Sequence, residues 1–394
     1  MRILYGIVGE GMGHATRSRV VLEHLLEQGH QVYVVVSGRA HRMIADGFAE
    51  RDNIQVKEIH GLQIAFQDNA VHRAKTVWNI LKGAPKGTLH NIQAYRQLMD
   101  LDFKPEVVIS DFESWAYFFA LNHRLPLISI DNMQIINRCA HPSYSTANHS
   151  LDYRLTRQIV KYKLPRAYHY LISSFFFPPV AKKRTTLLPP LLRPEVLAAK
   201  REPGKHILVY SSSISSMPDL LPTLQQLPYE FRVYCTGQTG IRGNVTLRAF
   251  SEQGFIDDLR TARAVIGGGG FSFMSEAVHL RVPMLSIPIQ GQFEQEMNAR
   301  YLEQLGYGDW SCTLDAQLIK DFLRNTTRFS QSLAKYQPQD NAMFFRCIDE
   351  LLYAISLDEP CMDRLESPAL GKYCGTPLPD EGFSVQGVPT FKNA

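Results

Sequence analysis

The residues closest to a recognisable chemistry lie in a glycine turn near the amino terminus. The turn reads GEGMGH, with Gly9, Gly11 and Gly13 followed by His14, directly after the strand-like run RILYGIV. A dinucleotide site would need GxGxxG and an acid at the end of the next strand, whereas this turn reads GxGxG and that strand ends VVVSGR. We therefore interpret His14 as a candidate general base on a stiff first helical turn. The alternative is a tight turn in which His14 only caps the helix.

Asp111 is the expected partner of His14. It ends the apolar run VVISD, and the carboxyl ends of parallel strands meet at one edge of a sheet, so the two residues can meet although they lie far apart in sequence. A carboxylate bonded to one imidazole nitrogen fixes the tautomer and leaves the other nitrogen to accept a proton. The alternative is that Asp111 caps a helix beginning at Glu113 or Ser114.

A second glycine turn, at the end of the segment AVIGGGG (264–270), indicates a binding site for an anion. Four glycines let a ligand approach the backbone, and the helix expected to open at 271–274 points its free N–H groups and positive dipole end at that ligand. One turn into this helix, Glu276 can reach a ribose diol. Glu294, Gln295 and Asn298 follow the next strand as candidates for reading hydroxyl groups. Such a site needs no metal.

The elements that must position these residues alternate regularly. Apolar runs at 2–8, 31–38, 105–111 and 126–132 are separated by helical patterns, and the alternation restarts after a proline-rich segment at 187–205. Continuous apolar strands between helices predict parallel sheets covered on both faces. The sequence therefore predicts an α/β protein of two doubly wound, Rossmann-like domains facing each other across a cleft. The boundaries are 1–190, a linker at 191–205, 206–350, and a tail at 351–394 that either packs back on the first domain or is loosely ordered.

Composition narrows the class of protein. A formal net charge of +4 over 394 residues is too small to argue for a nucleic-acid partner. The six cysteines form no CxxC pair and no His/Cys spacing that would cage a metal, so we expect reduced thiols and a cytoplasmic location. No signal peptide is visible, and no apolar run reaches the roughly 20 residues that cross a bilayer.

Several motifs resemble the GT-B glycosyltransferases, most closely the MurG-like group that includes the monogalactosyldiacylglycerol synthases. They are GFIDDL at 254–259, GGGGFSFMSEAVHLRVPMLSIP at 267–288 and FEQEMNA at 293–299. Their order and spacing resemble the donor domain of that family, and GEGMGH resembles its acceptor-side glycine loop with the terminal histidine. The resemblance covers both halves of the chain through about residue 350.

The resemblance implies roles for individual residues. Backbone around Phe255 and Ile256 would contact the nucleobase, and Glu276 the ribose hydroxyls. Glu294, where many relatives have Asp, would read the sugar hydroxyls together with Gln295. Six residues would contact the diphosphate: Gly269, Gly270, Phe271, Ser272, Ser211 and Ser212. Gly11 and Gly13 would belong to the loop on the acceptor side. The serines 211 and 212 belong to YSSSISS, where the family often has a glycine-rich loop.

These roles predict an inverting, metal-independent glycosyltransferase with no cofactor. Its co-substrate would be a nucleotide diphosphate sugar, with UDP as the first choice, and His14 would deprotonate the acceptor hydroxyl while Asp111 orients the ring. The acceptor stays open between a lipid, as the relatives use, and a glycan. The alternatives are a nucleotide-sugar 2-epimerase of the same fold and a non-catalytic nucleotide-sugar-binding protein.

The segment RAYHYLISSFFFPPVAKKR (166–184) admits two interpretations. Aromatic and aliphatic residues beside a basic cluster are typical of a membrane surface and would place the protein at the inner face of a membrane. We favour a buried strand, YLISSFFF, followed by a solvated loop, because the first domain needs another strand here. Weak peripheral membrane association is the alternative.

Overall fold

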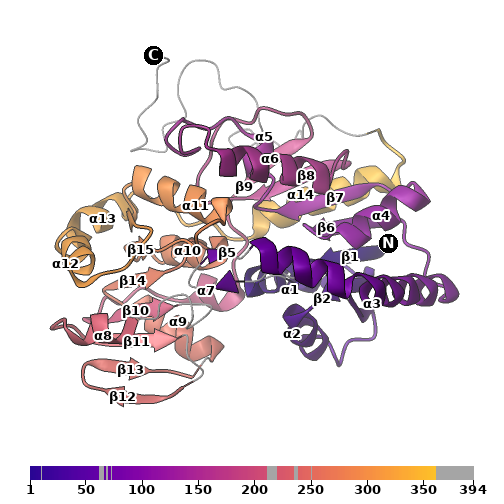
Figure 1. Ribbon diagram of the computed structural model, residues 1–394. Coiled ribbons are helices and arrows are strands. Elements are labelled where there is room, and N and C mark those ends of the chain that lie inside the picture. Colours follow the sequence, from indigo (N-terminus) through magenta and orange to yellow (C-terminus); the bar gives the residue numbers. More distant parts are fainter. Residues whose placement is uncertain are drawn as a thin grey trace.

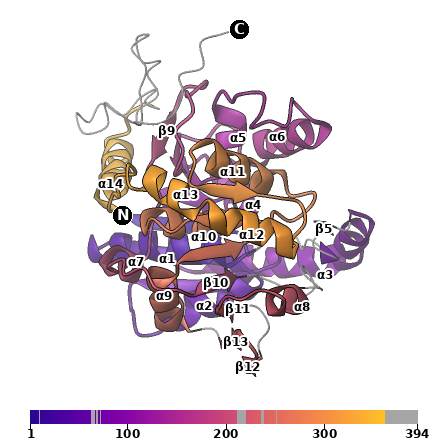
Figure 2. The same ribbon diagram turned by 90° about the vertical axis from the view of Figure 1, so that its left-hand side faces the viewer.

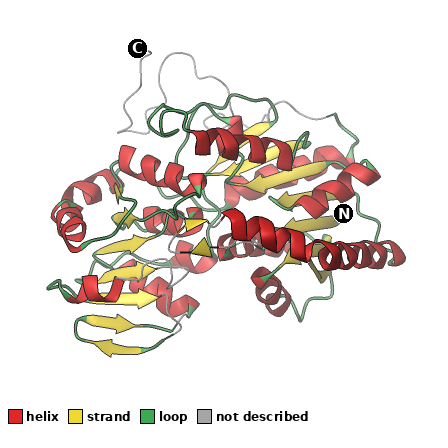
Figure 3. Cartoon of the chain, in the orientation of Figure 1, coloured by secondary structure: helices red, strands yellow, loops and turns green. Residues whose placement is uncertain are grey.

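A computed structural model of the chain describes residues 1–9, 11–61, 66–67, 70–71, 73–210, 220–234, 238–249 and 251–360. The described chain contains two seven-stranded sheets with helices packed around them, which confirms the predicted α/β class (Figures 1 and 3). A short pair, β4 (Phe66–Gln67) and β5 (Ala70–Val71), is antiparallel. Figure 2, turned by 90°, brings the second sheet and helices α12 and α13 toward the viewer.

The first sheet has the strand order β3-β2-β1-β6-β7-β8-β9, and its neighbouring strands are parallel. Most of its strand residues are buried, as expected of a sheet covered on both faces. The apolar runs of the sequence are therefore confirmed as strands. The strand expected over YLISSFFF forms only in its first part, since β8 ends at Ser173 and the buried Phe175 and Phe176 follow it in a loop. The strands are β1 (Arg2–Ile7), β2 (Gln31–Ser37), β3 (Ile54–Ile59), β6 (Val107–Asp111), β7 (Leu127–Asp131), β8 (His169–Ser173) and β9 (Thr185–Leu188).

Helices cover both faces of this sheet. One face packs against α1 (Met12–Glu27), α2 (Arg39–Gly47) and α14 (Ala342–Ser356), which bury side chains such as Leu25, Ile44 and Ile348 with Val34 of β2. The other face packs against α3 (Arg73–Asp100) and α4 (Ser114–His123). Helix α6 (Leu151–Lys163) lies beyond the strand ends, where Val160 packs with Val8 and Phe112. The short α5 (Ile135–Arg138) precedes α6. The amino-terminal domain thus has three layers.

The second sheet has the order β12-β13-β11-β10-β14-β15-β16 and is parallel except for the edge strand β12. Its strands are β10 (Ile207–Tyr210), β11 (Phe231–Tyr234), β12 (Gly240–Arg242), β13 (Val245–Leu247), β14 (Ala264–Gly267), β15 (Met284–Ser286) and β16 (Gly308–Trp310). Its helices are α8 (Leu220–Gln225), α9 (Glu252–Thr261), α10 (Phe271–His279), α11 (Phe293–Gln304), α12 (Ala316–Arg324) and α13 (Thr326–Leu333). The helix expected to open at 271–274 is α10.

Two segments tie the domains together. Within the expected linker 191–205, α7 (Pro194–Ala198) forms and buries Val196. After α13 the chain returns to the first domain as α14, where Phe344, Ile348 and Leu351 join the core beside α1. His24 of α1 stacks on Phe345 at 4.2 Å between ring centroids. The return therefore occurs before residue 342, earlier than the boundary expected at 350, because the apolar face of α14 completes a face of the first sheet.

Candidate active site

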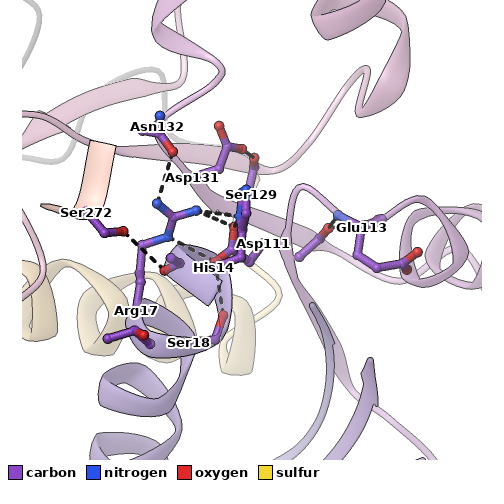
Figure 4. A network of polar contacts seen from close by, with 12 residues as sticks. His14, Arg17, Ser18, Asp111, Glu113, Ser129, Asp131, Asn132 and Ser272 are labelled. Carbon is purple, nitrogen blue, oxygen red and sulfur yellow. Dashed lines mark hydrogen bonds and ion pairs between the residues drawn. The ribbon is translucent and has the colours of Figure 1, made fainter. Parts of the chain in front are cut away.

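His14 and Asp111 lie together at the carboxyl edge of the first sheet (Figure 4). His14 Nδ1 is 2.7 Å from Asp111 Oδ1, and the histidine side chain keeps 18% of its surface exposed while the carboxylate is fully buried. His14 Nε2 has no hydrogen-bond partner among the described residues. The structure thus brings together the pair that the sequence suggested and leaves the second ring nitrogen open to a substrate.

The fold explains why these two residues meet. Strands β1 and β6 are parallel neighbours in which Ile7 aligns with Asp111, so both strands end at the same edge. Gly11 caps α1 with a φ of 88°, a left-handed conformation that favours glycine and turns the chain directly into the helix that carries His14. Glu113, not Asp111, caps α4, because its carboxylate accepts the N–H of Ala116 at 2.7 Å. Asp111 is therefore free for the histidine.

Arg17 is a member of this site that the sequence analysis missed. It lies one turn after His14 on α1 and is only 3% exposed. Its Nε donates to Asp111 Oδ2 at 2.9 Å and its terminal nitrogen to Asp111 Oδ1 at 2.6 Å. Ser18 Oγ also donates to Oδ2, at 3.0 Å. The spacing of three residues from His14 was the available signal, since such residues share a helix face.

The surroundings of Asp111 keep it ionised. Burial raises its pKa, but the charge of Arg17, the neighbouring His14 and the hydrogen bonds from both outweigh burial and bring the pKa to about 2. In turn, the pKa of Arg17 is raised, because Asp111 more than offsets the burial of the guanidinium. The pair is thus a buried carboxylate and a buried guanidinium that each hold the other in its charged form.

The geometry also favours one tautomer of His14. Arg17 places a nitrogen 2.7 Å from His14 Nδ1, the same ring nitrogen that faces Asp111. A guanidinium nitrogen always carries hydrogens and a carboxylate only accepts, so a proton on Nδ1 satisfies Asp111 and the Arg17 nitrogen directs its hydrogen to Oδ1 instead. Nε2 then carries the lone pair, as a general base requires.

A chain of hydrogen bonds leads from this pair into the second domain. Arg17 donates to Asn132 Oδ1 at 3.0 Å, and Asn132 Nδ2 donates to Glu294 Oε1 at 2.7 Å. Asn298 Nδ2 donates to the same Glu294 oxygen at 2.6 Å and to the carbonyl of Gly269 at 3.1 Å. Burial raises the pKa of Glu294, although Asn298, His14 and Asn132 oppose that rise. Sequence reasoning missed Asn132, which directly follows β7.

Gln295 and Asn298 hold the glycine turn of the second domain in place. Gln295 Oε1 accepts the N–H groups of Gly269 and Ile289, both at 3.1 Å. A Cβ on Gly269 would lie 2.4 Å from the carbonyl oxygen of Gln295, so only glycine lets α11 approach the turn this closely. Gly270 faces open space. The structure therefore gives Gln295 and Asn298 a supporting contact, and their role in reading a sugar stays a prediction.

The amino terminus of α10 meets the glycine turn of the first domain. No side chain caps α10 and its first turn holds no acid. Phe271 is buried against Phe175, and Ser272 Oγ donates to the carbonyl of Gly13 at 3.3 Å. A Cβ on Gly13 would lie 2.6 Å from that hydroxyl oxygen. The two glycine turns thus face each other across the domain boundary. The backbone N–H groups at the start of α10, which no side chain caps, lie beside α1, the helix that carries His14.

The remaining predicted residues have partners of their own or lie outside the described chain. Glu276 is buried, and Arg193 donates to both of its oxygens, at 2.9 and 3.0 Å. Burial raises the pKa of Glu276 despite this ion pair. Phe255 and Ile256 are buried in α9, where the Phe255 N–H bonds to the carbonyl of Ser251. Ser211 and Ser212 lie outside the described residues.

The described residues contain neither a metal-binding cluster nor a membrane-spanning helix. Across these ranges, no group of three or more histidine, cysteine, aspartate or glutamate side chains could hold a metal ion. In the same part of the chain, no helix combines the length and apolar character needed to cross a membrane.

Comparison with known proteins identifies the family. Residues 1–327 match the family model described as glycosyl transferase family 1, and the chain belongs to that family. An uncharacterized glycosyltransferase of Methanosarcina acetivorans is 26% identical over 344 residues, which cover 78% of this chain and 85% of the relative. The protein is therefore a glycosyltransferase.

Solved structures show the same fold. LpCGTa in complex with UDP has a TM-score of 0.59 at 14% identity and covers 90% of this chain and 99% of its own. The spinosyn rhamnosyltransferase SpnG complexed with thymidine diphosphate has a TM-score of 0.58 at 17% identity and covers 89% and 100%. The chain thus has the GT-B fold of two Rossmann-like domains that the sequence predicted.

Proposed function

We propose that this glycosyltransferase inverts the anomeric centre of a nucleotide diphosphate sugar, without a metal, as it transfers the sugar to an acceptor hydroxyl. One observation carries the proposal: the His14–Asp111 pair lies beside the uncapped amino terminus of α10 and its glycine turn. A general base and an anion site at one domain boundary are what such a transfer needs.

The reaction divides between the two domains. His14 Nε2 takes the acceptor proton as the hydroxyl oxygen bonds to the anomeric carbon, and the bond from that carbon to the donor phosphate oxygen breaks on the opposite face. The electron pair of that bond leaves with the nucleotide diphosphate, whose growing negative charge faces the N–H groups of α10. Residues 1–190 would hold the acceptor and 206–350 the donor.

Asp111 and Arg17 position the base. Asp111 fixes the His14 ring and tautomer and stabilises the imidazolium formed when the proton arrives. Arg17 holds the carboxylate through two hydrogen bonds, so Asp111 has little freedom to rotate away. Arg17 is thus a positioning residue that acts through Asp111.

The donor is proposed to be a UDP-sugar. UDP is the ligand of LpCGTa, whereas the SpnG complex holds thymidine diphosphate, so both nucleotides belong in the first experiment. Glu294 would accept hydrogen bonds from the sugar. Asn132 and Asn298 both donate to its Oε1, whereas its Oε2 has no hydrogen-bond partner among the described residues, and a carboxylate oxygen can accept more than one bond. Glu276 would likewise share its oxygens between Arg193 and the ribose.

The motifs GGGGFSFMSEAVHLRVP and FEQEMNA support placement in the MurG-like group, and with it a lipid or glycan acceptor. The fold and the family alone leave the acceptor open, since the glycosyltransferases of similar fold use different acceptors.

The experiment is thermal unfolding with UDP, thymidine diphosphate, GDP, their common sugar conjugates and NAD. A ligand at one hundred times its dissociation constant should stabilise the protein by about 2.7 kcal/mol, which raises the unfolding midpoint by several degrees. A shift with UDP and its conjugates supports the proposal, and released UDP with a glycosylated product completes it. Epimerised donor without released nucleotide, binding without turnover, or a shift only with NAD would overturn it.

A further inference from the structure

Helix α6 exposes a continuous apolar stripe. Leu151, Leu155, Ile159 and Tyr162 follow one another at spacings of four, four and three residues, which places them on one helix face. Their exposed fractions are 68%, 45%, 64% and 68%. The opposite face supplies the packing of this helix, because Tyr153 and Val160 are buried. The exposed stripe therefore does not contribute to the packing of α6 on the domain. A contiguous exposed apolar surface of this kind indicates a site that binds another protein or a membrane.

Cations border one side of the stripe. Arg154 and Lys161 lie beside it and are exposed, and the exposed Arg157 lies farther round the helix. The helix carries a single acid, Asp152. Lys163 instead packs its ammonium over the Phe112 ring, at 4.2 Å from the ring centroid. This pattern is typical of helices that lie in the plane of a membrane interface, with aliphatic and aromatic side chains on one face and lysine or arginine around them. Long basic side chains can rest their stems along the apolar surface and keep their charges at the lipid headgroups.

A neighbouring loop strengthens the positive field. Lys182, between β8 and β9, donates to Asn137 Oδ1 and is half-buried. Its pKa is lowered by burial and by the nearby charges of Arg138, Arg157 and Lys161. Arg157 and Lys161 of α6 are thus close enough to the loop to lower the pKa of Lys182. The basic residues of α6 and of this loop therefore form one cluster.

We propose that α6 and this basic cluster form a docking surface for an anionic phospholipid bilayer. The surface lies on the helix next to the proposed sugar site: Tyr153, on the inner face of α6, packs on Phe293, the residue before Glu294. A docked membrane would therefore sit one helix away from the reaction centre. The inference goes beyond the proposed function and does not depend on it, because docking requires no turnover. It also places membrane contact on α6 and not on YLISSFFF, since β8 and the following Phe175 and Phe176 are buried.

The charges favour a bilayer over a second copy of this chain. In a symmetric pair the same patch meets itself, so two α6 stripes in contact would bring Arg154 and Lys161 of one copy near those of the other. Like charges brought together in an interface oppose association. An anionic lipid surface instead attracts every cation of the cluster.

The test measures binding of the full chain to sedimented vesicles of phosphatidylcholine alone and of phosphatidylcholine with phosphatidylserine. The first variant, Leu155→Gln/Ile159→Gln, removes the centre of the stripe, and its control is Tyr353→Gln, a 68% exposed aromatic on α14. The second, Arg154→Gln/Lys161→Gln, removes two flanking charges, and its control is Arg328→Gln/Lys335→Gln on the exposed surface of the second domain. All four substituted sets are exposed, so circular dichroism should show that each protein stays folded.

We expect the unmodified chain to sediment with phosphatidylserine vesicles and far less with phosphatidylcholine. At about 1 kcal/mol per basic residue near an anionic surface, losing two charges should weaken partitioning roughly thirtyfold, the stripe variant should lose binding, and both controls should bind as before. The proposal fails if the unmodified chain does not bind, if both vesicles bind it equally, or if the stripe variant binds unchanged. It also fails if light scattering shows a dimer that the stripe variant dissociates, since the stripe would then be a self-association surface. None of these results bears on donor binding, which the nucleotide experiment measures separately.

Discussion

Replacing Asp111 with asparagine should destabilise the first domain strongly, because it leaves Arg17 buried without its counter-charge. The two side chains are 0% and 3% exposed and share two hydrogen bonds of 2.6 and 2.9 Å. Removing one partner of a buried ion pair typically costs about 3–5 kcal/mol. The depressed pKa acts in the same direction, since a fall from 3.8 to about 2 corresponds to roughly 2 kcal/mol of stability from the ionised carboxylate at neutral pH. We expect Asp111→Asn to lower stability by about 3 kcal/mol.

Urea unfolding at neutral pH, followed by circular dichroism, measures this loss. Arg17→Met and the double variant Arg17→Met/Asp111→Asn complete a double-mutant cycle, in which we expect a coupling of at least about 1.5 kcal/mol. Arg19→Met is the matched control, because Arg19 lies on the same helix, is 25% exposed and pairs only with partly exposed acids. Its loss should stay within about 1 kcal/mol.

The pH dependence supplies a second readout of the same pair. Because the folded state lowers the pKa of Asp111, the carboxylate contributes stability fully above pH 3.8 and loses that contribution as the pH falls toward 2. Asp111→Asn should therefore flatten the acid side of the stability profile. A loss under 1 kcal/mol, additive effects in the cycle, or an unchanged acid limb would refute the assignment of a buried ion pair.

Three further predictions concern the domain boundary. Gly13→Ala places a Cβ 2.6 Å from Ser272 Oγ, so we expect donor binding to weaken by about 1 kcal/mol or more. Unchanged affinity in calorimetry would show that donor binding does not depend on the close approach of the two turns. Glu294→Gln should weaken binding of the UDP-sugar by about tenfold or more, as expected when a hydrogen bond to a charged group is lost, and should leave the affinity for UDP itself unchanged. Equal effects on both ligands would show that Glu294 does not contact the sugar. Glu276→Gln should weaken UDP and UDP-sugar alike, and unaltered UDP affinity would contradict the ribose contact.

The meeting of His14 and Asp111 could be predicted because it depends on topology alone. Parallel strands that end at one edge bring their following residues together, and both strands were evident as apolar runs. The glycine turn before α10 was equally readable, since an apolar run that leads into glycines and then into a helical pattern is typical of a strand, a tight turn and a helix in doubly wound folds. The two-domain α/β architecture followed from the same alternation.

The partners of the charged residues could not be predicted, because they depend on how the two domains sit. Arg193 belongs to a segment that looked like a linker, yet it binds Glu276 across the domain boundary. Asn132 bridges Arg17 and Glu294 only because the end of β7 faces the start of α11. Side chains such as Gln295, expected to face a ligand, also bond the backbone of the turn. Such pairings arise from long-range packing, which local sequence patterns do not encode.

The most direct test of the account is donor turnover by His14→Gln. The assay measures release of nucleotide diphosphate from the preferred donor, with and without acceptor, beside calorimetric affinity for the same donor. A general base contributes about 10²–10⁴-fold to the rate, so we expect turnover to fall by that factor while donor affinity stays within about twofold of the unmodified protein. Unchanged turnover, with donor bound as before, would show that His14 does not remove the acceptor proton and would contradict the mechanism.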